Sequence, residues 1–255
     1  MKKLLIFLFS LSLPKYLFKK TKIVRGSVHR NDRFGGVHRA WGHVFSNHLQ
    51  GVYVEFGVYK GDGIISSLFC HAEFIGWLNE QKVSDEKWRR EVANKSPLNV
   101  TPTFHCLDTY DGMPKNDEGA ISFEQDTFYT DLETVKERIK ENNPLNCKII
   151  HYQGLFKDTS PQLKENLKNK AIAIANIDCD LMESTVDALE AIKDNIDIGT
   201  VLLFDDYNAF SGDQNKGQRK AFSDFQKNSN FVFEKFYTYH YCGQAFLVVG
   251  KAEDL

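Results

Sequence analysis

Five short apolar runs recur along the chain, and each of them ends at a polar or glycine residue. They span residues 52–56, 103–107, 148–152, 171–177 and 200–204. Near-continuous apolar runs rich in Ile and Val are typical of central strands in a parallel sheet that is covered on both faces. The pattern therefore predicts five buried parallel strands.

Amphipathic stretches between these runs predict helices. Asp131 is placed to cap a helix over residues 132–141, which the Asn-Asn-Pro at 142–144 ends. Ser184 with Asp187 three residues later forms a capping-box pattern and predicts a second helix with three apolar residues on its buried face (Val186, Leu189 and Ile192). Strands that alternate with helices predict right-handed crossovers and a doubly wound α/β sheet.

The polar residues that follow the five runs are expected to lie close together. In a doubly wound sheet, ligands bind beyond the carboxyl ends of the strands. Glycines or acids follow the runs at that edge: Gly57, Asp108, Gly154, Asp178, Asp205 and Asp206. The order of elements therefore predicts one site at the carboxyl edge of the sheet.

The first run leads into a glycine-rich turn, Gly57-Val-Tyr-Lys-Gly61-Asp-Gly63. Its spacing differs from the G-x-G-x-x-G of dinucleotide-binding folds, and no Gly-Lys-Ser/Thr closes a phosphate loop. Glu55, two residues before the first glycine, would repel pyrophosphate and suits a cationic ligand such as S-adenosylmethionine. Asp108 ends the second run, where nucleotide-binding folds place an acid for ribose hydroxyls. An ordinary glycine turn and a capping aspartate are the alternatives.

Two pairs of aspartates end the fourth and fifth runs: Asp178 with Asp180, and Asp205 with Asp206. Like charges that are brought together repel each other unless a proton or a cation lies between them. Three carboxylates with room for water and substrate describe a Mg²⁺ site, and the remaining aspartate could act as a general base. Each pair taken alone is a common turn or cap motif, but their position on consecutive strand ends favours the metal site.

Composition and charge narrow the class of protein. The 32 basic and 34 acidic residues give a formal net charge of −2, which offers no basic face for nucleic acid. The five cysteines lack metal spacing and predict free thiols in a reducing, cytoplasmic setting. Residues 1–20 are lysine-rich and apolar without a small-x-small cleavage site, so an arm (1–30) that packs on a partner subunit, a membrane-surface anchor and a cleaved signal all stay open.

Together these segments resemble the macrocin O-methyltransferase (TylF-type) family of S-adenosylmethionine-dependent sugar methyltransferases. The resemblance extends over about residues 31–251 and is most specific in the aspartate-rich motifs. The matching stretches begin at Val54 (Val-Glu-Phe-Gly-Val-Tyr-Lys-Gly), Leu107 (Leu-Asp-Thr-Tyr-Asp-Gly-Met-Pro), Gly154 (Gly-Leu-Phe-Lys-Asp-Thr-Ser-Pro), Ile177 (Ile-Asp-Cys-Asp-Leu-Met-Glu-Ser-Thr), Phe204 (Phe-Asp-Asp-Tyr) and Gly217 (Gly-Gln-Arg).

The resemblance implies a Rossmann-like class I methyltransferase domain over residues 31–255. Its mostly parallel, seven-stranded sheet would carry an antiparallel edge near residues 231–236 and 245–249, with helices on both faces. The resemblance also implies site residues: Mg²⁺ ligands Asp178, Asp205 and Asp206; Asp180 as base; Glu55, Gly57 and Gly61 at the methionine part of the donor; Asp108 at its ribose; Gly154 and Leu155 at its adenine; and Tyr59, Thr109 and Asp178 elsewhere in the donor site.

The implied activity is Mg²⁺-dependent O-methylation of a sugar or glycan precursor by a homo-oligomeric enzyme. The precursor could belong to a surface polysaccharide or to a glycosylated natural product. The segment over residues 74–101 is longer than is typical of the family, and it predicts an exposed helix near the acceptor pocket. A catechol or phosphorylated acceptor, a nicotinamide-dependent oxidoreductase and a non-catalytic glycan- or subunit-binding protein are the alternatives.

Overall fold

The computed structural model describes residues 28–119 and 123–252, so the predicted arm over residues 1–30 lies outside it except for its last three residues. Seven strands form one sheet in the order β3-β2-β1-β4-β5-β7-β6. The strands are β1 (Val52–Phe56), β2 (Phe104–Asp108), β3 (Ile149–Gln153), β4 (Ile172–Ile177), β5 (Val201–Phe204), β6 (Phe231–Tyr239) and β7 (Gly243–Lys251). Strands β1 to β5 are parallel, and β7 is antiparallel to β5 and β6. The doubly wound sheet with an antiparallel edge is thereby confirmed.

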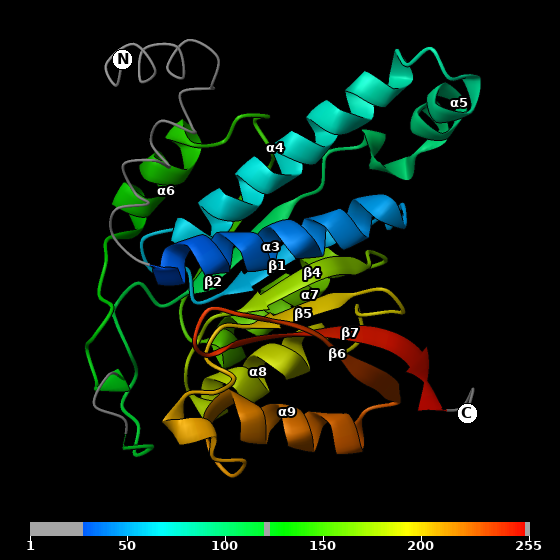
Figure 1. The fold of residues 1–255 in the computed structure, drawn as a ribbon. Helices are drawn as coiled ribbons and strands as arrows, with labels where there is room; N and C mark the ends of the chain where they lie inside the picture. The colour runs from blue at the N-terminus through cyan, green and yellow to red at the C-terminus, as the bar shows by residue number, and fades with distance from the viewer. Residues whose placement is uncertain (1–27, 120–122, 253–255) are drawn as a thin grey trace, which may run out of the picture.

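Helices cover both faces of the sheet (Figure 1). One face carries α3 (Val28–Ser46), α4 (Asp62–Lys82) and α6 (Leu132–Glu141), and the other carries α7 (Phe156–Leu167), α8 (Met182–Ile192) and α9 (Gly217–Asn228). Helix α5 (Lys87–Lys95) lies beyond the far end of α4, away from the sheet. None of the described helices combines the length and the apolar character needed to cross a membrane.

Four of the five apolar runs form strands that are buried on both faces, whereas β3, at the edge of the sheet, is mostly half-buried and corrects the prediction of five buried strands. In β1, Tyr53 packs into the core beneath α3 and α4, while Val52, Val54 and Phe56 pack into the core beneath α7, α8 and α9. Alternate side chains of a strand point to opposite faces, so one run supplies both cores. The five cysteines are free thiols, as predicted.

Two predicted helices have different outcomes. Asp131 caps α6 as expected, because its carboxylate accepts a hydrogen bond of 2.8 Å from the Thr134 amide. The capping box at Ser184 is wrong, since α8 begins at Met182 and has no side-chain cap of its own. Val186, expected on the buried face, is 45% exposed.

The strand order changes direction between β1 and β4, which are parallel neighbours at the centre of the sheet. The turn after β1 comes so close to β4 that a Cβ on Gly57 would lie 1.9 Å from the carbonyl oxygen of Asp178. Gly57 also has a φ of +85°, which disfavours any other residue. The glycine at position 57 therefore allows the turn after β1 to lie directly against the aspartate segment that follows β4.

Candidate active site

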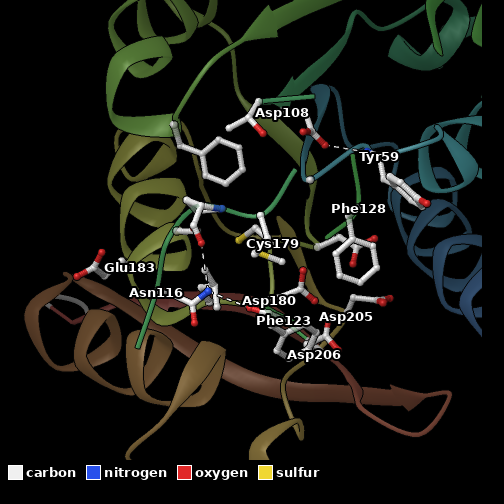
Figure 2. Close-up of a pocket in the computed structure, with 18 of the residues that line it drawn as sticks. Tyr59, Asp108, Asn116, Phe123, Phe128, Cys179, Asp180, Glu183, Asp205 and Asp206 are labelled. Atoms are coloured by element: carbon white, nitrogen blue, oxygen red, sulfur yellow. Dashed lines mark hydrogen bonds between the residues drawn. The ribbon is translucent and has the colours of Figure 1, made fainter. Parts of the chain in front are cut away.

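A cavity of about 930 Å³ opens at the carboxyl edge of the sheet. Its walls are the turn after β1, the loop after β2, the start of α7, the connection from β4 to α8 and the end of β5. Figure 2 shows Asp180, Asp205 and Asp206 grouped at one end of the cavity and Asp108 at the other. A volume of this size suits a ligand of several hundred daltons.

The four aspartates predicted at the ends of β4 and β5 meet in space. One carboxylate oxygen from each of Asp178, Asp205 and Asp206 lies within 4.8 Å of the others. Asp180 lies beside them with a φ of +61° and shares a side-chain hydrogen bond with Asp206. We call these four residues the acidic centre. Their predicted convergence is confirmed, whereas their roles stay predictions.

Two side chains that were not predicted, an arginine and a histidine, pair with the carboxylates of the acidic centre. The guanidinium of Arg33, from α3, lies 3.1 Å from Asp178 Oδ2 and also pairs with Asp205 Oδ2. His240, from the β6–β7 hairpin, lies 2.9 Å from Asp205 Oδ1. The Cys242 amide donates to His240 Nδ1, so the ring proton is on Nε2 and points at Asp205.

The environment divides the four carboxyls into two kinds. Burial raises the pKa of Asp178, Asp180 and Asp206, and the proximity of the other carboxylates adds to the rise for all three. Burial also acts to raise the pKa of Asp205, but Arg33 and His240 outweigh it and hold that pKa at about 2. The hydrogen bond between Asp180 and Asp206 acts to raise the pKa of Asp180 and to lower that of Asp206, so Asp180 is the donor and Asp206 the acceptor.

The backbone of Asp206 is fixed by a side chain from α9. The amide of Gln218 donates to the carbonyl of Ile177, and its carbonyl accepts from the Asp206 N–H, both at 2.9 Å. Gln218 is buried. This side chain therefore sets the end of β5 against the end of β4, where the ligand atoms of the acidic centre originate.

Asp108 lies on the cavity wall and fastens the glycine-rich turn to β2. One carboxylate oxygen accepts from the amides of Val58 and Tyr59, and the other accepts from the amide of Tyr110, each at 2.7 Å. A carboxylate offers about four lone-pair sites, so one acceptor position remains for a ligand hydroxyl. The structure therefore gives Asp108 a structural role in addition to the predicted one.

Glu55 does not line the cavity, which corrects its predicted contact with a cationic ligand. Its side chain is fully buried beneath the turn and accepts from the Tyr53 hydroxyl at 2.5 Å, the Ile64 amide at 3.1 Å and the Asn176 side chain at 3.2 Å. Burial raises the pKa of Glu55 to about 7. Glu55 thus positions the first turn of α4, and Gly63 leaves the space for its carboxylate.

The other predicted donor-binding residues are divided between the cavity and its surroundings. Gly57, Tyr59, Thr109 and Leu155 line the cavity together with Asp108 and Asp178. Gly61 is instead the residue before α4, where its φ of +82° turns the chain into the helix. Gly154 lines a smaller neighbouring pocket that also touches Thr109 and Leu155.

The loop after β2 closes one side of the cavity and supplies the cap that α8 lacks. Glu118 accepts a hydrogen bond of 2.5 Å from the Met182 amide at the start of α8. Asn116 donates to the carbonyls of Pro114 and Phe123, and Phe123 packs on Phe210 with ring centroids 5.6 Å apart. The loop is therefore tied to α8 and to the segment after β5.

Residues 74–101 do not reach the site, contrary to the prediction that they lie near the acceptor pocket. They form the end of α4 and all of α5, where Trp77 and Trp88 are exposed as expected, but none of them lines the cavity. Arg33, Glu118 and His240 are the site residues that the sequence analysis missed. Only His240 had a usable signal, because the turn between two antiparallel strands beyond β5 must lie at the carboxyl edge.

A family model and a curated protein are similar in sequence to this chain. The family model described as macrocin-O-methyltransferase (TylF) matches residues 26–235. A curated protein of Streptomyces olivaceus, 8-demethyl-8-(2,3-dimethoxy-alpha-L-rhamnosyl)-tetracenomycin-C 4'-O-methyltransferase, is 30% identical over 172 residues. The match covers 64% of this chain and 56% of that protein, so the chain spans only about half the length of this relative.

Two solved structures have the same fold. The O-methyltransferase NovP superposes with a TM-score of 0.61 at 20% identity and covers 86% of this chain and 80% of its own. The calicheamicin methyltransferase CalS11 superposes with a TM-score of 0.65 at 17% identity and covers 98% of this chain and 91% of its own. At these identities the likeness extends to the fold alone.

Proposed function

Because the chain belongs to the macrocin-O-methyltransferase (TylF) family, we propose that it transfers a methyl group from S-adenosylmethionine to a sugar hydroxyl in a Mg²⁺-dependent reaction. The observation that carries this proposal is the acidic centre, which lies in the wall of a cavity large enough for both donor and acceptor. The family supplies the class of reaction, and the carboxylates supply the metal dependence.

The residues present fit a divalent cation. Asp178, Asp205 and Asp206 offer three oxygens within 4.8 Å, and they are already neutralised in part by the Arg33 guanidinium. Mg²⁺ prefers oxygen ligands and keeps open positions for substrate. When bound, Mg²⁺ would hold neighbouring hydroxyls of the acceptor and lower the pKa of one of them. His240 fixes the orientation of Asp205 toward that position.

Asp180 is the proposed general base. It adjoins the ligands without being one of them, and its raised pKa gives the carboxylate a stronger hold on a proton than a surface aspartate has. Asp180 would give up its own proton when a cation occupies the acidic centre, and its carboxylate could then accept the proton of the acceptor hydroxyl. The chain thereby supplies a place for the proton that the acceptor hydroxyl loses on methylation.

The donor is proposed to occupy the end of the cavity near Asp108. The turn after β1 exposes backbone there, Asp108 keeps one acceptor position, and Leu155 with Phe156 provides an apolar wall. A polar ribose and an apolar adenine fit this division. The methyl group would then face the acidic centre, because both ends open into the same cavity (Figure 2).

A sugar acceptor is supported by the curated relative, whose name describes methylation of a rhamnosyl group. A catechol or a phosphorylated small molecule also presents the oxygens that this chemistry needs. A nicotinamide-dependent oxidoreductase is disfavoured by the G-x-x-x-G-x-G spacing, in which Gly57 and Gly61 serve the β1–β4 contact and the start of α4.

The test is a screen of acceptors with methyl-labelled S-adenosylmethionine, Mg²⁺ and the purified full chain. Nucleotide-linked sugars, rhamnosides and other glycan fragments form one arm, and catechols form the other. Labelled product from a sugar supports the proposal, and product from catechols alone contradicts the sugar part. Calorimetry with S-adenosylmethionine and with NAD decides the donor, because binding of NAD alone would exclude methyl transfer.

A further inference from the structure

We infer that Arg33 is a built-in counter-ion of the acidic centre, which a divalent cation must displace when it binds. The inference rests on the metal part of the proposed function. Arg33 bridges Asp178 and Asp205, the two carboxylates that end neighbouring strands β4 and β5. These are two of the three residues proposed to ligate the metal. A guanidinium and a dication would therefore use the same carboxylates and would repel each other.

The hydrogen bonds of Asp205 show which partner leaves. Its Oδ1 accepts from His240, and its Oδ2 pairs with Arg33, so both oxygens are in use. The His240 side chain is fully buried and is held by the Cys242 amide as well. The Arg33 side chain is 23% exposed and thus has a route to solvent. Arg33 is therefore the partner that can give way to an ion.

The hydrogen bonding of Arg33 is incomplete, which favours its displacement. Its Nε is buried and has no hydrogen-bond partner among the described residues. A guanidinium has five N–H donors, so this one leaves part of its hydrogen-bonding capacity unused. The ion pairs that hold Arg33 here are those to Asp178 and Asp205, and metal binding would remove both.

Helix α3 itself is firmly docked, so displacement requires only the side chain to move. A Cβ on Gly36 would lie 2.7 Å from the Tyr239 ring, which shows how closely the helix approaches β6. The Tyr237 hydroxyl donates to the Gly36 carbonyl at 2.6 Å. These contacts hold the helix one turn beyond Arg33 and leave its side chain to swing outward.

The experiment measures Mn²⁺ binding by electron paramagnetic resonance, without donor or acceptor, for wild type, Arg33→Gln and Arg39→Gln. Arg39 lies on the same helix and bonds to Thr238 rather than to the acidic centre, so it is the matched control. Arg33→Gln should lower the dissociation constant for Mn²⁺ at least tenfold, about 1.4 kcal/mol. It should also lower the melting temperature of the metal-free protein, because the carboxylates lose their counter-ion. Arg39→Gln should leave the Mn²⁺ affinity unchanged.

Arg33→Lys guards against misfolding of the Gln variant, since it keeps the charge but not the planar fork. Its dissociation constant should lie between those of wild type and Arg33→Gln. Equal or weaker Mn²⁺ binding in both Arg33 variants would overturn this inference and leave the metal site standing. Absence of Mn²⁺ binding in every protein, wild type included, would overturn both the inference and the metal part of the proposed function.

Discussion

Replacing Asp180 by Asn should remove the proposed general base without destabilising the fold. Asn tolerates the left-handed backbone of this position, where φ is +61°. Its amide can also donate to Asp206, which is the hydrogen bond that the protonated Asp180 makes. We therefore expect the free energy of unfolding to fall by no more than about 1 kcal/mol. Because burial raises the pKa of Asp180, the ionised acid is disfavoured near neutral pH, and any change should be toward greater stability.

The rate should respond very differently. General-base catalysis typically contributes about 10²–10⁴-fold, so kcat should fall by that factor, or about 3–5 kcal/mol in the barrier. The assay is the initial rate of methyl transfer at saturating donor and acceptor, together with thermal unfolding and calorimetric binding of the donor. Asp85→Asn, at an exposed position between α4 and α5, is the control and should behave as wild type. A kcat for Asp180→Asn within about threefold of wild type would remove Asp180 as the base.

Three further predictions concern the supports of the site. Gly57→Ala should destabilise the fold by about 3 kcal/mol or more in urea unfolding, because Gly57 has a positive φ and lies against the Asp178 carbonyl. Gly76 on α4 has open space around it, so Gly76→Ala should instead stabilise the fold by about 0.5–1 kcal/mol, and equal effects of the two substitutions would contradict this reasoning. Burial raises the pKa of Glu55 from 4.5 to about 7, so the free energy of unfolding of wild type should fall by about 3 kcal/mol as the pH rises from 4.5 to above 7. Glu55→Gln should lack this loss, and parallel profiles of unfolding free energy against pH for the two proteins would refute the prediction. Glu118→Ala should expose the loop after β2 to faster limited proteolysis and raise KM, whereas exposed Glu124→Ala should not; equal cleavage rates would show that the cap on α8 does not hold the loop.

The strands were predictable because their signal is local. The run at 52–56 matches β1, and the other four predicted runs begin within one residue of β2 to β5. The two final strands are longer than the predicted residues 231–236 and 245–249 but lie in the same place. Burial on both faces of the central strands favours apolar residues at most positions, and this preference is visible in the sequence alone.

The parts that failed depend on partners far apart along the chain. The start of α8 is capped by Glu118, which lies 64 residues away, so the local pattern at Ser184 was misleading. Glu55 points inward because Tyr53 and Asn176 surround it, and no spacing rule shows which face a strand residue takes. Arg33 reaches Asp205 across 172 residues of sequence, only because α3 packs against β6. Such contacts follow from the tertiary packing and from no motif.

The proposed reaction depends most on whether the acidic centre binds a metal ion that catalysis needs. The most direct measurement is the initial rate of methyl transfer by chelator-treated enzyme, before and after Mg²⁺ is restored, for wild type and for Asp178→Ala. We expect wild type to lose its activity with chelator and to regain it with Mg²⁺, while Asp178→Ala stays inactive at both stages and still binds S-adenosylmethionine. Full activity of the chelated wild type, or rates for Asp178→Ala equal to those of wild type, would contradict the account.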